Sequence, residues 1–191
     1  MFARLFAALL ALFTKKPNTV AAPLPTYTPT PEPVKRPTGK GAAIGGVAGA
    51  ATIAAIVAFI GPWEGRRYTA YQDIVGVWTI CEGHTKGVKA GDVATDAQCD
   101  EMAAQDVAEH NAGIRACITR PMPQNVEIAF TSLAFNAGVG AFCGSTALRR
   151  YNAGDDTGAC DALNMWVRAG GKVVKGLVNR RAAESALCKK D

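Results

Sequence analysis

Two acidic side chains have a spacing that suits acid–base chemistry: Glu64 and, nine residues later, Asp73. When two carboxyl groups face each other across a cleft, one that is kept protonated donates a proton to a leaving oxygen. The other stays ionised and either activates water or stabilises a developing cation. Paired acids are also common as solvated surface charges, so the spacing alone leaves both interpretations open.

The residues around these carboxylates predict a helix end followed by a small hairpin. Gly65 directly follows Glu64 and is typical of a helix stop. The next segment combines aromatic and β-branched residues with Gly76, which favours two short strands joined by a turn. Glu64 is therefore expected at the end of a helix, and Asp73 on a sheet beside it.

The remainder of the chain is predicted to be mostly helical. Thr95 and Gln98 form a capping box, which opens a helix that reaches about Arg115. After two prolines, apolar residues at helical spacing predict a buried helix over residues 126–137. Further helices are expected around residues 145–152, 157–168 and 177–188, with a break at Gly170-Gly171.

Composition and charge limit the class of protein. The chain has 191 residues, of which 49% are apolar, so it is not wholly disordered. Its formal net charge of +5 resides in residues 1–40, which hold six basic side chains and one acidic side chain, whereas residues 41–191 hold 15 of each. The body thus lacks the basic surface of a nucleic-acid-binding protein, and we expect no nucleic-acid partner.

All six cysteines lie in the last 111 residues. An even number in a compact region indicates disulfides and an oxidising compartment; the alternative is buried free thiols in the cytosol. Cys81 and His84 have the spacing of zinc ligands, but no convincing second pair accompanies them, so no metal is expected. The disulfide candidates are Cys81, Cys99, Cys117, Cys143, Cys160 and Cys188.

The N-terminal third divides into three segments of contrasting composition. Residues 1–16 form an amphipathic segment, interpreted as a membrane-surface helix or, alternatively, as a cleaved signal. Residues 17–40 are a Pro-rich spacer. Residues 41–61 are uncharged and rich in Gly and Ala, which predicts a weak transmembrane signal-anchor, either permanent or able to leave the bilayer. Basic residues ahead of this span place the N-terminus in the cytoplasm and residues 62–191 outside.

Residues 62–191 resemble the phage-type lysozymes, a family of glycoside hydrolases. The motifs that carry the resemblance are Glu64, Asp73, Thr79, Gly83-His84-Thr85, Gln105-Asp106, Phe135-Asn136-Ala137-Gly138, Trp166 and Asn179-Arg180-Arg181. Because a Gly/Ala-rich span precedes Glu64, the chain also resembles one subgroup of this family, the signal-arrest-release endolysins of lambdoid phages. The implied fold is α+β and lysozyme-like: a small β-hairpin lobe packed on a mostly helical lobe, with the active cleft between them and the weak transmembrane segment ahead.

The activity implied by this resemblance is that of a muramidase acting on peptidoglycan. Such an enzyme hydrolyses the β-1,4 bonds between N-acetylmuramic acid and N-acetylglucosamine, with inversion as the family expectation and with no cofactor. Glu64 is then the general acid, while Asp73 and Thr79 position water or stabilise the transition state. Arg180 is the best match for the arginine that pairs with this acid in family members.

The resemblance also implies supporting contacts. His84 is expected to pair with Asp106, and Asn136 is expected to contact sugar. Trp166 is interpreted as a core residue rather than a sugar platform. Rough correspondence with the family pairs the cysteines as Cys81–Cys99, Cys117–Cys143 and Cys160–Cys188, although six cysteines allow many other pairings.

The closeness of the span to Glu64 links location to activity. Only Pro62 and Trp63 separate them, so a membrane-held chain keeps Glu64 near the bilayer and away from its partners. We therefore expect an inactive form in the host inner membrane and an active monomer in the periplasm after release, with a functional dependence on a holin. The long N-terminal extension leaves a permanently anchored, partly active enzyme as an alternative.

Two functions from other classes remain open. One is a non-catalytic, membrane-tethered module that binds peptidoglycan, which has no need of Glu64, Asp73 and Thr79 together. The other is a lytic transglycosylase, which would use Glu64 but not Asp73. The reaction products distinguish them, because hydrolysis leaves reducing ends and transglycosylation leaves anhydro sugars.

Overall fold

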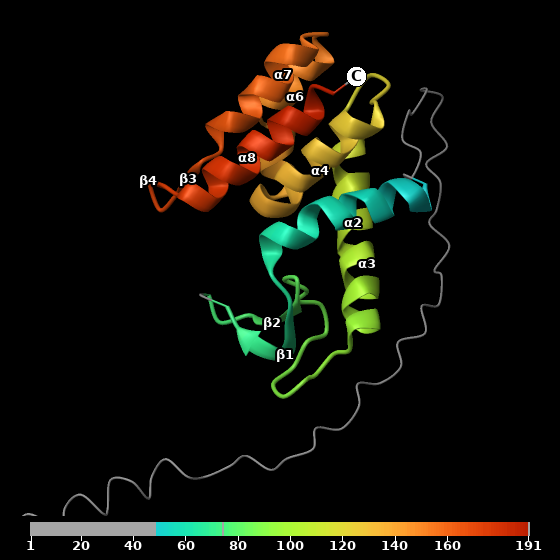
Figure 1. Cartoon of the computed structure of the whole chain (residues 1–191), viewed down its shortest axis with the longest axis vertical. Coiled ribbons are helices and arrows are strands. Elements are labelled where there is room, and N and C mark those ends of the chain that lie inside the picture. The colour runs from blue at the N-terminus through green and yellow to red at the C-terminus, as the bar shows by residue number, and fades with distance from the viewer. Residues whose placement is uncertain (1–48, 74, 191) are drawn as a thin grey trace, which may run out of the picture.

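The computed structural model describes residues 49–73 and 75–190 of the chain (Figure 1). The expected surface helix of residues 1–16, the spacer of residues 17–40 and the first part of the expected span, residues 41–48, lie outside the described residues. A small hairpin lobe and a larger helical lobe are connected by one long helix, α3 (Asp96–Arg115). This arrangement confirms the predicted lysozyme-like α+β fold.

Helix α2 (Ala50–Glu64) begins within the expected span and ends at the first candidate carboxylate. Gly65 terminates it with a φ of 71°, a left-handed conformation that glycine adopts without strain, so the predicted stop is confirmed. Ile56 and Ile60 are buried with Val107 of α3 in a small apolar cluster. None of the described helices is both long and apolar enough to span a membrane. The span over residues 41–61 stays a prediction.

Strands β1 (Arg67–Gln72) and β2 (Trp78–Cys81) form the predicted antiparallel hairpin. Tyr71 on β1 is paired with Thr79 on β2. In the connecting turn, Gly76 has a φ of 83°, which a residue with a side chain rarely adopts. The hairpin covers a small core of its own, made by Ile80, Cys81, Ala94 and Cys99.

Helix α3 (Asp96–Arg115) runs between the two lobes (Figure 1). Thr95 and Gln98 make both hydrogen bonds of the predicted capping box at its start. Along its length, Cys99 belongs to the core of the hairpin lobe, Val107 to the cluster beneath α2, and Ile114 to the core of the helical lobe. Because one helix contributes to all three clusters, it fixes the position of each lobe relative to α2.

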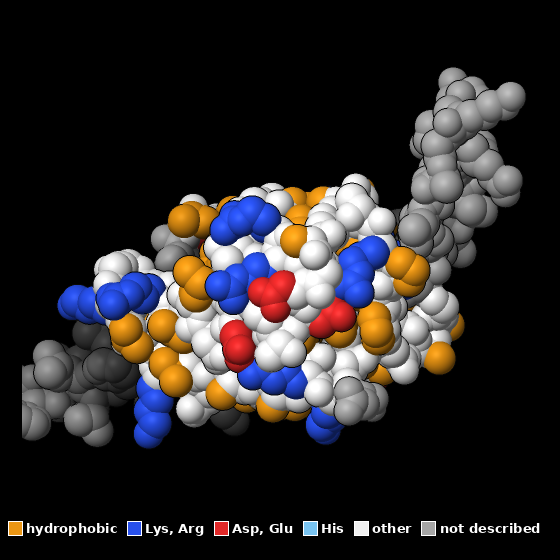
Figure 2. Space-filling view, turned by 90° about the horizontal axis from the view of Figure 1, so that it is seen from above, with side chains coloured by type: hydrophobic (Ala, Val, Ile, Leu, Met, Phe, Trp, Pro, Cys, Tyr) orange, Lys and Arg blue, Asp and Glu red, His pale blue; other side chains and the backbone are white. Residues whose placement is uncertain are grey.

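Helix α4 (Gln124–Ala137) forms the centre of the helical lobe. The ring of Phe130 lies 5.1 Å from that of Phe142 and 5.3 Å from that of Tyr151, between centroids. Figure 2 views one end of the molecule, where acidic and basic side chains are interspersed. The remaining elements are α5 (Val139–Cys143), α6 (Thr146–Asn152), α7 (Asp156–Ala162), the 3-10 helix η1 (Leu163–Met165), β3 (Arg168–Ala169), β4 (Lys172–Val173) and α8 (Lys175–Cys188).

The helix expected over residues 157–168 is shorter than predicted. Helix α7 ends at Ala162, η1 ends at Met165, and a second small hairpin follows. Gly170 and Gly171 form its turn with φ angles of 54° and 77°, as a tight turn between twisted strands requires. The break at these glycines was predicted, but the hairpin was not, because strands of two residues leave almost no hydrophobic pattern.

Three disulfides connect the elements in the pairs that the family resemblance implied. Cys81–Cys99 joins β2 to α3 in the hairpin lobe. Cys117–Cys143 ties the segment after α3 to α5, and Cys160–Cys188 ties α7 to the end of α8. Each lobe is therefore cross-linked within itself, and none of the three bonds connects the hairpin lobe to α8.

Candidate active site

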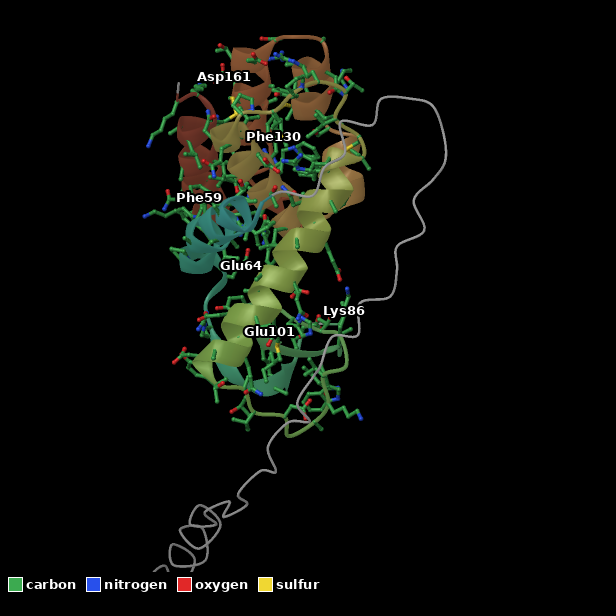
Figure 3. All side chains as sticks on the ribbon, turned by 90° about the vertical axis from the view of Figure 1, so that its right-hand side faces the viewer. Phe59, Glu64, Lys86, Glu101, Phe130 and Asp161 are labelled. Carbon is green, nitrogen blue, oxygen red and sulfur yellow. A yellow bond between two sulfur atoms is a disulfide. The ribbon has the colours of Figure 1, made fainter. Side chains whose placement is uncertain are left out.

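Glu64 lies at the junction of the two lobes, where α2 ends and the chain turns towards β1 (Figure 3). Its side chain is 19% exposed, and its Oε1 accepts a hydrogen bond from Nη1 of Arg180 at 2.5 Å. Arg180 is on α8 and is only 4% exposed. The ion pair expected from the family resemblance is thus present, and it fixes a half-buried carboxyl group that still reaches solvent.

Asp73 occupies the turn between β1 and β2, directly after the end of β1, and not a strand of the sheet as predicted. Its Oδ1 accepts hydrogen bonds from the backbone N–H groups of Val75 at 2.9 Å and Val77 at 2.8 Å. An aspartate at the start of a turn commonly binds the following amides in this way. These bonds orient the carboxylate and leave Oδ2 without a hydrogen bond from any described residue, which suits it to hold a water or a substrate group.

Thr79 is on β2, buried, and connected to Asp73 through the backbone of Val77. The hydroxyl of Thr79 donates to the carbonyl oxygen of Val77 at 3.0 Å, while the amide of the same residue donates to Asp73. A hydroxyl that donates one hydrogen bond can still accept others. One backbone unit therefore orders both side chains, a connection that the sequence analysis did not foresee.

The structure brings Asp73 and Thr79 together on the hairpin but does not bond either of them to Glu64 among the described residues. Direct contact is not required, because an inverting glycosidase leaves room between its two carboxyl groups for sugar and water, about 6.5–9.5 Å. Of the three predicted residues, Glu64 ends α2, and Asp73 and Thr79 belong to the hairpin that follows it in the chain.

Behind Glu64 lies a buried group of charges that sequence reasoning missed in part. Glu184 on α8 is fully buried, and its Oε1 lies 3.1 Å from Nε of Arg180 and 3.0 Å from Nη2 of Arg181. The hydroxyl of Ser132 on α4 donates to the same oxygen at 2.6 Å. Burial raises the pKa of Glu184 and lowers the pKa of Arg181 to about 10. The four-residue spacing of Arg180 and Glu184 was the available signal.

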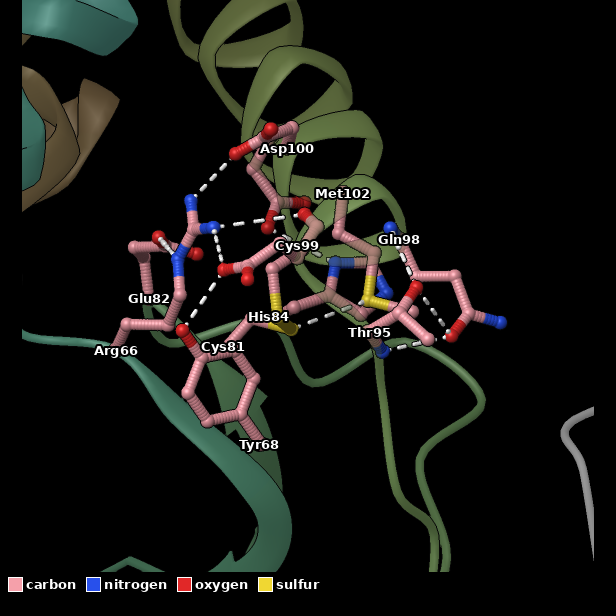
Figure 4. Close-up of a disulfide and its surroundings, with 12 residues drawn as sticks. Arg66, Tyr68, Cys81, Glu82, His84, Thr95, Gln98, Cys99, Asp100 and Met102 are labelled. Carbon is pink, nitrogen blue, oxygen red and sulfur yellow. Dashed lines mark hydrogen bonds and ion pairs between the residues drawn. A yellow bond between two sulfur atoms is a disulfide. The ribbon is translucent and has the colours of Figure 1, made fainter.

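Arg66 forms a second charge cluster two residues after Glu64 (Figure 4). Its guanidinium group binds Oε1 of Glu82 at 2.5 Å, Oδ1 of Asp96 at 2.9 Å and Oδ1 of Asp100 at 2.6 Å. The chain between α2 and β1 is thereby tied both to the residue that follows β2 and to the first two turns of α3. Sequence reasoning did not identify this cluster, because its members are far apart in the chain.

The predicted pair of His84 and Asp106 is also present. Nδ1 of His84 lies 2.9 Å from Oδ2 of Asp106, and Nε2 lies 3.1 Å from the carbonyl oxygen of Lys86. The hydrogen bond to Asp106 raises the pKa of His84, because it favours the protonated ring. The pair fastens the loop after β2 to α3, which is a structural role within the hairpin lobe.

The other predicted residues have simpler surroundings. Asn136 is exposed at the end of α4, and its Oδ1 accepts a hydrogen bond from Arg181 at 3.2 Å, which leaves its amide group free to donate. Trp166 is half-buried and packs against the core of the helical lobe, in agreement with the core interpretation. Cys81 and Cys99 lie near Glu82 in a metal-like grouping, but their shared disulfide leaves no thiolate to bind zinc.

Similar proteins place this arrangement in a family. The sequence model of the family described as Phage lysozyme matches residues 61–184. The SAR-endolysin of Enterobacteria phage P21 is 43% identical over 153 residues, which cover 77% of this chain and 91% of that protein. The SAR-endolysin of Pseudomonas phage phiKMV is 45% identical over 143 residues, covering 72% and 88%.

Solved structures agree with the sequence relatives. The muramidase domain of SpmX from Asticcacaulis excentricus superimposes with a TM-score of 0.68 at 33% identity, covering 72% of this chain and 96% of that domain. A P22 lysozyme variant superimposes with a TM-score of 0.65 at 35% identity, covering 71% and 96%. The family model covers more than half of the chain, and the two sequence relatives are over 40% identical across more than two thirds of it, so the chain belongs to the phage lysozyme family.

Proposed function

We propose that this chain is an endolysin that hydrolyses the β-1,4 bonds between N-acetylmuramic acid and N-acetylglucosamine in peptidoglycan during host-cell lysis. Its family makes it a glycoside hydrolase of the lysozyme type. The observation that carries the proposal is the setting of Glu64, half-buried at the lobe junction, paired with Arg180 and followed directly by the hairpin that holds Asp73 and Thr79. A module that only binds glycan has no need of this set.

In the proposed mechanism, Glu64 acts as the general acid. Its protonated carboxyl group donates to the glycosidic oxygen as the bond to the leaving sugar breaks, which avoids the expulsion of a high-energy alkoxide. Positive charge then develops on the sugar ring. Asp73, held in one orientation by two backbone amides, stabilises that charge and accepts a hydrogen bond from the attacking water through its Oδ2.

Thr79 completes the water site in this mechanism. Its hydroxyl donates to Val77 and therefore presents its lone pairs to a water held beside Asp73. Attack by that water from the face opposite the leaving group inverts the configuration of the sugar carbon. Asn136 binds the sugar through its free amide group, while His84 and Asp106 support the hairpin lobe without contacting substrate.

For location, we propose that residues 41–61 hold the chain in the host inner membrane until release delivers it to the periplasm. The relatives at 43% and 45% identity are named SAR-endolysins, which supports this order of events. Helix α2 supports it further, because residues 50–61 belong both to the expected span and to the helix that presents Glu64. One segment cannot lie in lipid and pack against α3 and α4 at the same time, so the tethered form is inactive. A holin is the proposed trigger.

The full chain and its Glu64→Gln variant, assayed on purified peptidoglycan, test the proposed chemistry. Wild type is expected to release soluble fragments with reducing ends, and Glu64→Gln is expected to lose at least about a thousandfold of that rate, because an amide cannot donate the proton. Glu101→Gln, which changes an exposed carboxylate on α3, is the matched control and should remain active. Full activity of Glu64→Gln would refute the proposal, and anhydro products would identify a transglycosylase instead.

A further inference from the structure

The guanidinium group of Arg180 is shared between two carboxylates of different surroundings. Its Nη1 binds Glu64 at 2.5 Å, and its Nε binds Glu184 at 3.1 Å. Glu64 is 19% exposed, whereas Glu184 is fully buried. Nη2 of Arg180 donates to the carbonyl oxygen of Ser132 at 3.1 Å, so each of its three nitrogens has an acceptor.

Arg181 adds a second positive charge to the same site. It is fully buried, and its Nη2 lies 3.0 Å from the oxygen of Glu184 that also binds Arg180. Its Nε and Nη1 and the second oxygen of Glu184 have no hydrogen-bond partner among the described residues. Four charges from two helices, Glu64, Arg180, Arg181 and Glu184, therefore interact at one place and sum to no net charge. Three of them are buried, and only Glu64 reaches solvent.

This arrangement bears on a difficulty in the chemistry. A general acid must be protonated when substrate is bound, yet a neighbouring arginine stabilises the ionised carboxylate. Glu184 offsets this effect because its negative charge neutralises Arg180 from the other side, and Arg181 in turn limits how far Glu184 does so. Interactions between charges of this kind are strong where water is excluded.

We propose that Glu184 and Arg181 are positioning residues that set, through Arg180, the pH range over which Glu64 keeps its proton. Neither residue touches substrate; each acts on Glu64 through the shared guanidinium group. The inference rests on the proposed role of Glu64 as general acid. Ser132 from α4 contributes a neutral donor to Glu184. Among the described residues, the charged group that binds Glu64 is Arg180, with Glu184 and Arg181 behind it.

The proposal predicts shifts of opposite sign for two charge-removing substitutions. Glu184→Gln removes a negative charge and is expected to lower the pKa of Glu64, which moves the alkaline limb of the kcat/KM profile to lower pH by about one unit, a tenfold change in its acid dissociation constant. Arg181→Met removes a positive charge and should move that limb to higher pH by a similar amount. A residue with only a structural role would reduce the rate without moving the limb.

Two further variants act as controls for charge and folding. Arg181→Lys keeps the charge, so its alkaline limb should stay within about 0.3 pH units of wild type. The double variant Arg181→Met with Glu184→Gln removes one charge of each sign and should also retain the wild-type limb. The single variants could fail to fold, because each leaves a buried charge unpaired. In that case the double variant is the test: an alkaline limb that differs from the wild-type limb by more than about half a pH unit overturns the proposal.

Titration of the Glu64 carboxyl carbon by NMR in the full chain separates this inference from the proposed function. If the wild-type Glu64 titration does not coincide with the alkaline limb of activity, the general-acid role fails. If the two coincide but the Glu64 titration is the same in Glu184→Gln, Arg181→Met and wild type, the general-acid role stands and the inference about Glu184 and Arg181 is wrong. Opposite shifts in the two single variants support both.

Discussion

Replacement of Arg66 by Gln should destabilise the protein and lower its activity together. The guanidinium group of Arg66 is 26% exposed and binds three carboxylates that differ greatly in exposure. Those of Asp96 and Asp100 are 74% and 65% exposed, so solvent and salt screen them, and each pair contributes less than about 1 kcal/mol. Glu82 is only 9% exposed, and its Oε2 has no partner among the described residues.

The pair of Arg66 and Glu82 therefore dominates the expected loss. Breaking a buried ion pair from one side costs about 3–5 kcal/mol, because the remaining charge has no partner. Because Arg66 is partly exposed, its loss should cost an amount at the lower end of this range. We therefore expect Arg66→Gln to lower the free energy of unfolding by about 3 kcal/mol. Activity should fall as well, since Arg66 fixes the chain two residues after Glu64.

Urea denaturation of wild type, Arg66→Gln, Glu82→Gln and the double variant measures this coupling as a double-mutant cycle. The double variant is expected to be no less stable than Arg66→Gln, with a coupling energy of about 2 kcal/mol between the two residues. The loss should persist at high salt, because the screened pairs with Asp96 and Asp100 contribute little of it. A coupling energy below about 0.5 kcal/mol would show that the burial argument is wrong.

Two further predictions concern α2 and the hairpin lobe. Ile56→Ala should destabilise the protein by about 3 kcal/mol and reduce peptidoglycan hydrolysis, because it loosens the helix that carries Glu64; Ala54→Ser on the exposed face is the control in both assays. Asp106→Asn should lower Tm most below pH 6.5, where wild-type His84 is charged in both the folded and the unfolded state, and the difference should shrink as pH rises through the raised pKa of His84. A Tm difference that is equal at all pH values would contradict the second prediction.

Local rules predicted the elements that position the candidate site. Gly65 ends α2 with a positive φ, and the Thr95 capping box starts α3, because both features depend on residues within one turn of helix. The hairpin likewise follows from strand-forming residues on either side of Gly76. These predictions placed Glu64 correctly at a helix end, but they put Asp73 on a strand, whereas it lies in the turn one residue beyond β1.

The charge clusters could not be predicted in this way, since their energies depend on burial that only the fold creates. Arg180 and Glu184 are four residues apart, a spacing that on an exposed helix gives only a weak ion pair. In the folded chain both side chains are buried, and Ser132 from α4 binds the carboxylate of Glu184. Arg66 shows the same limit, because its partners in α3 are 30 and 34 residues away.

The composition of α2 reconciles the two locations proposed for residues 50–61. The buried residues of this helix, Ile56 and Ile60, have large side chains. The exposed residues between positions 50 and 58 are all alanine. A helix with large apolar residues all round would be held firmly by lipid, but it would expose a broad apolar face once docked in water. Alanine on the outer face weakens the binding of the helix to lipid, and it leaves little apolar surface exposed to water when the helix is docked on the protein. The weak apolar character of the expected span is thus what a helix needs if it is to serve in both places.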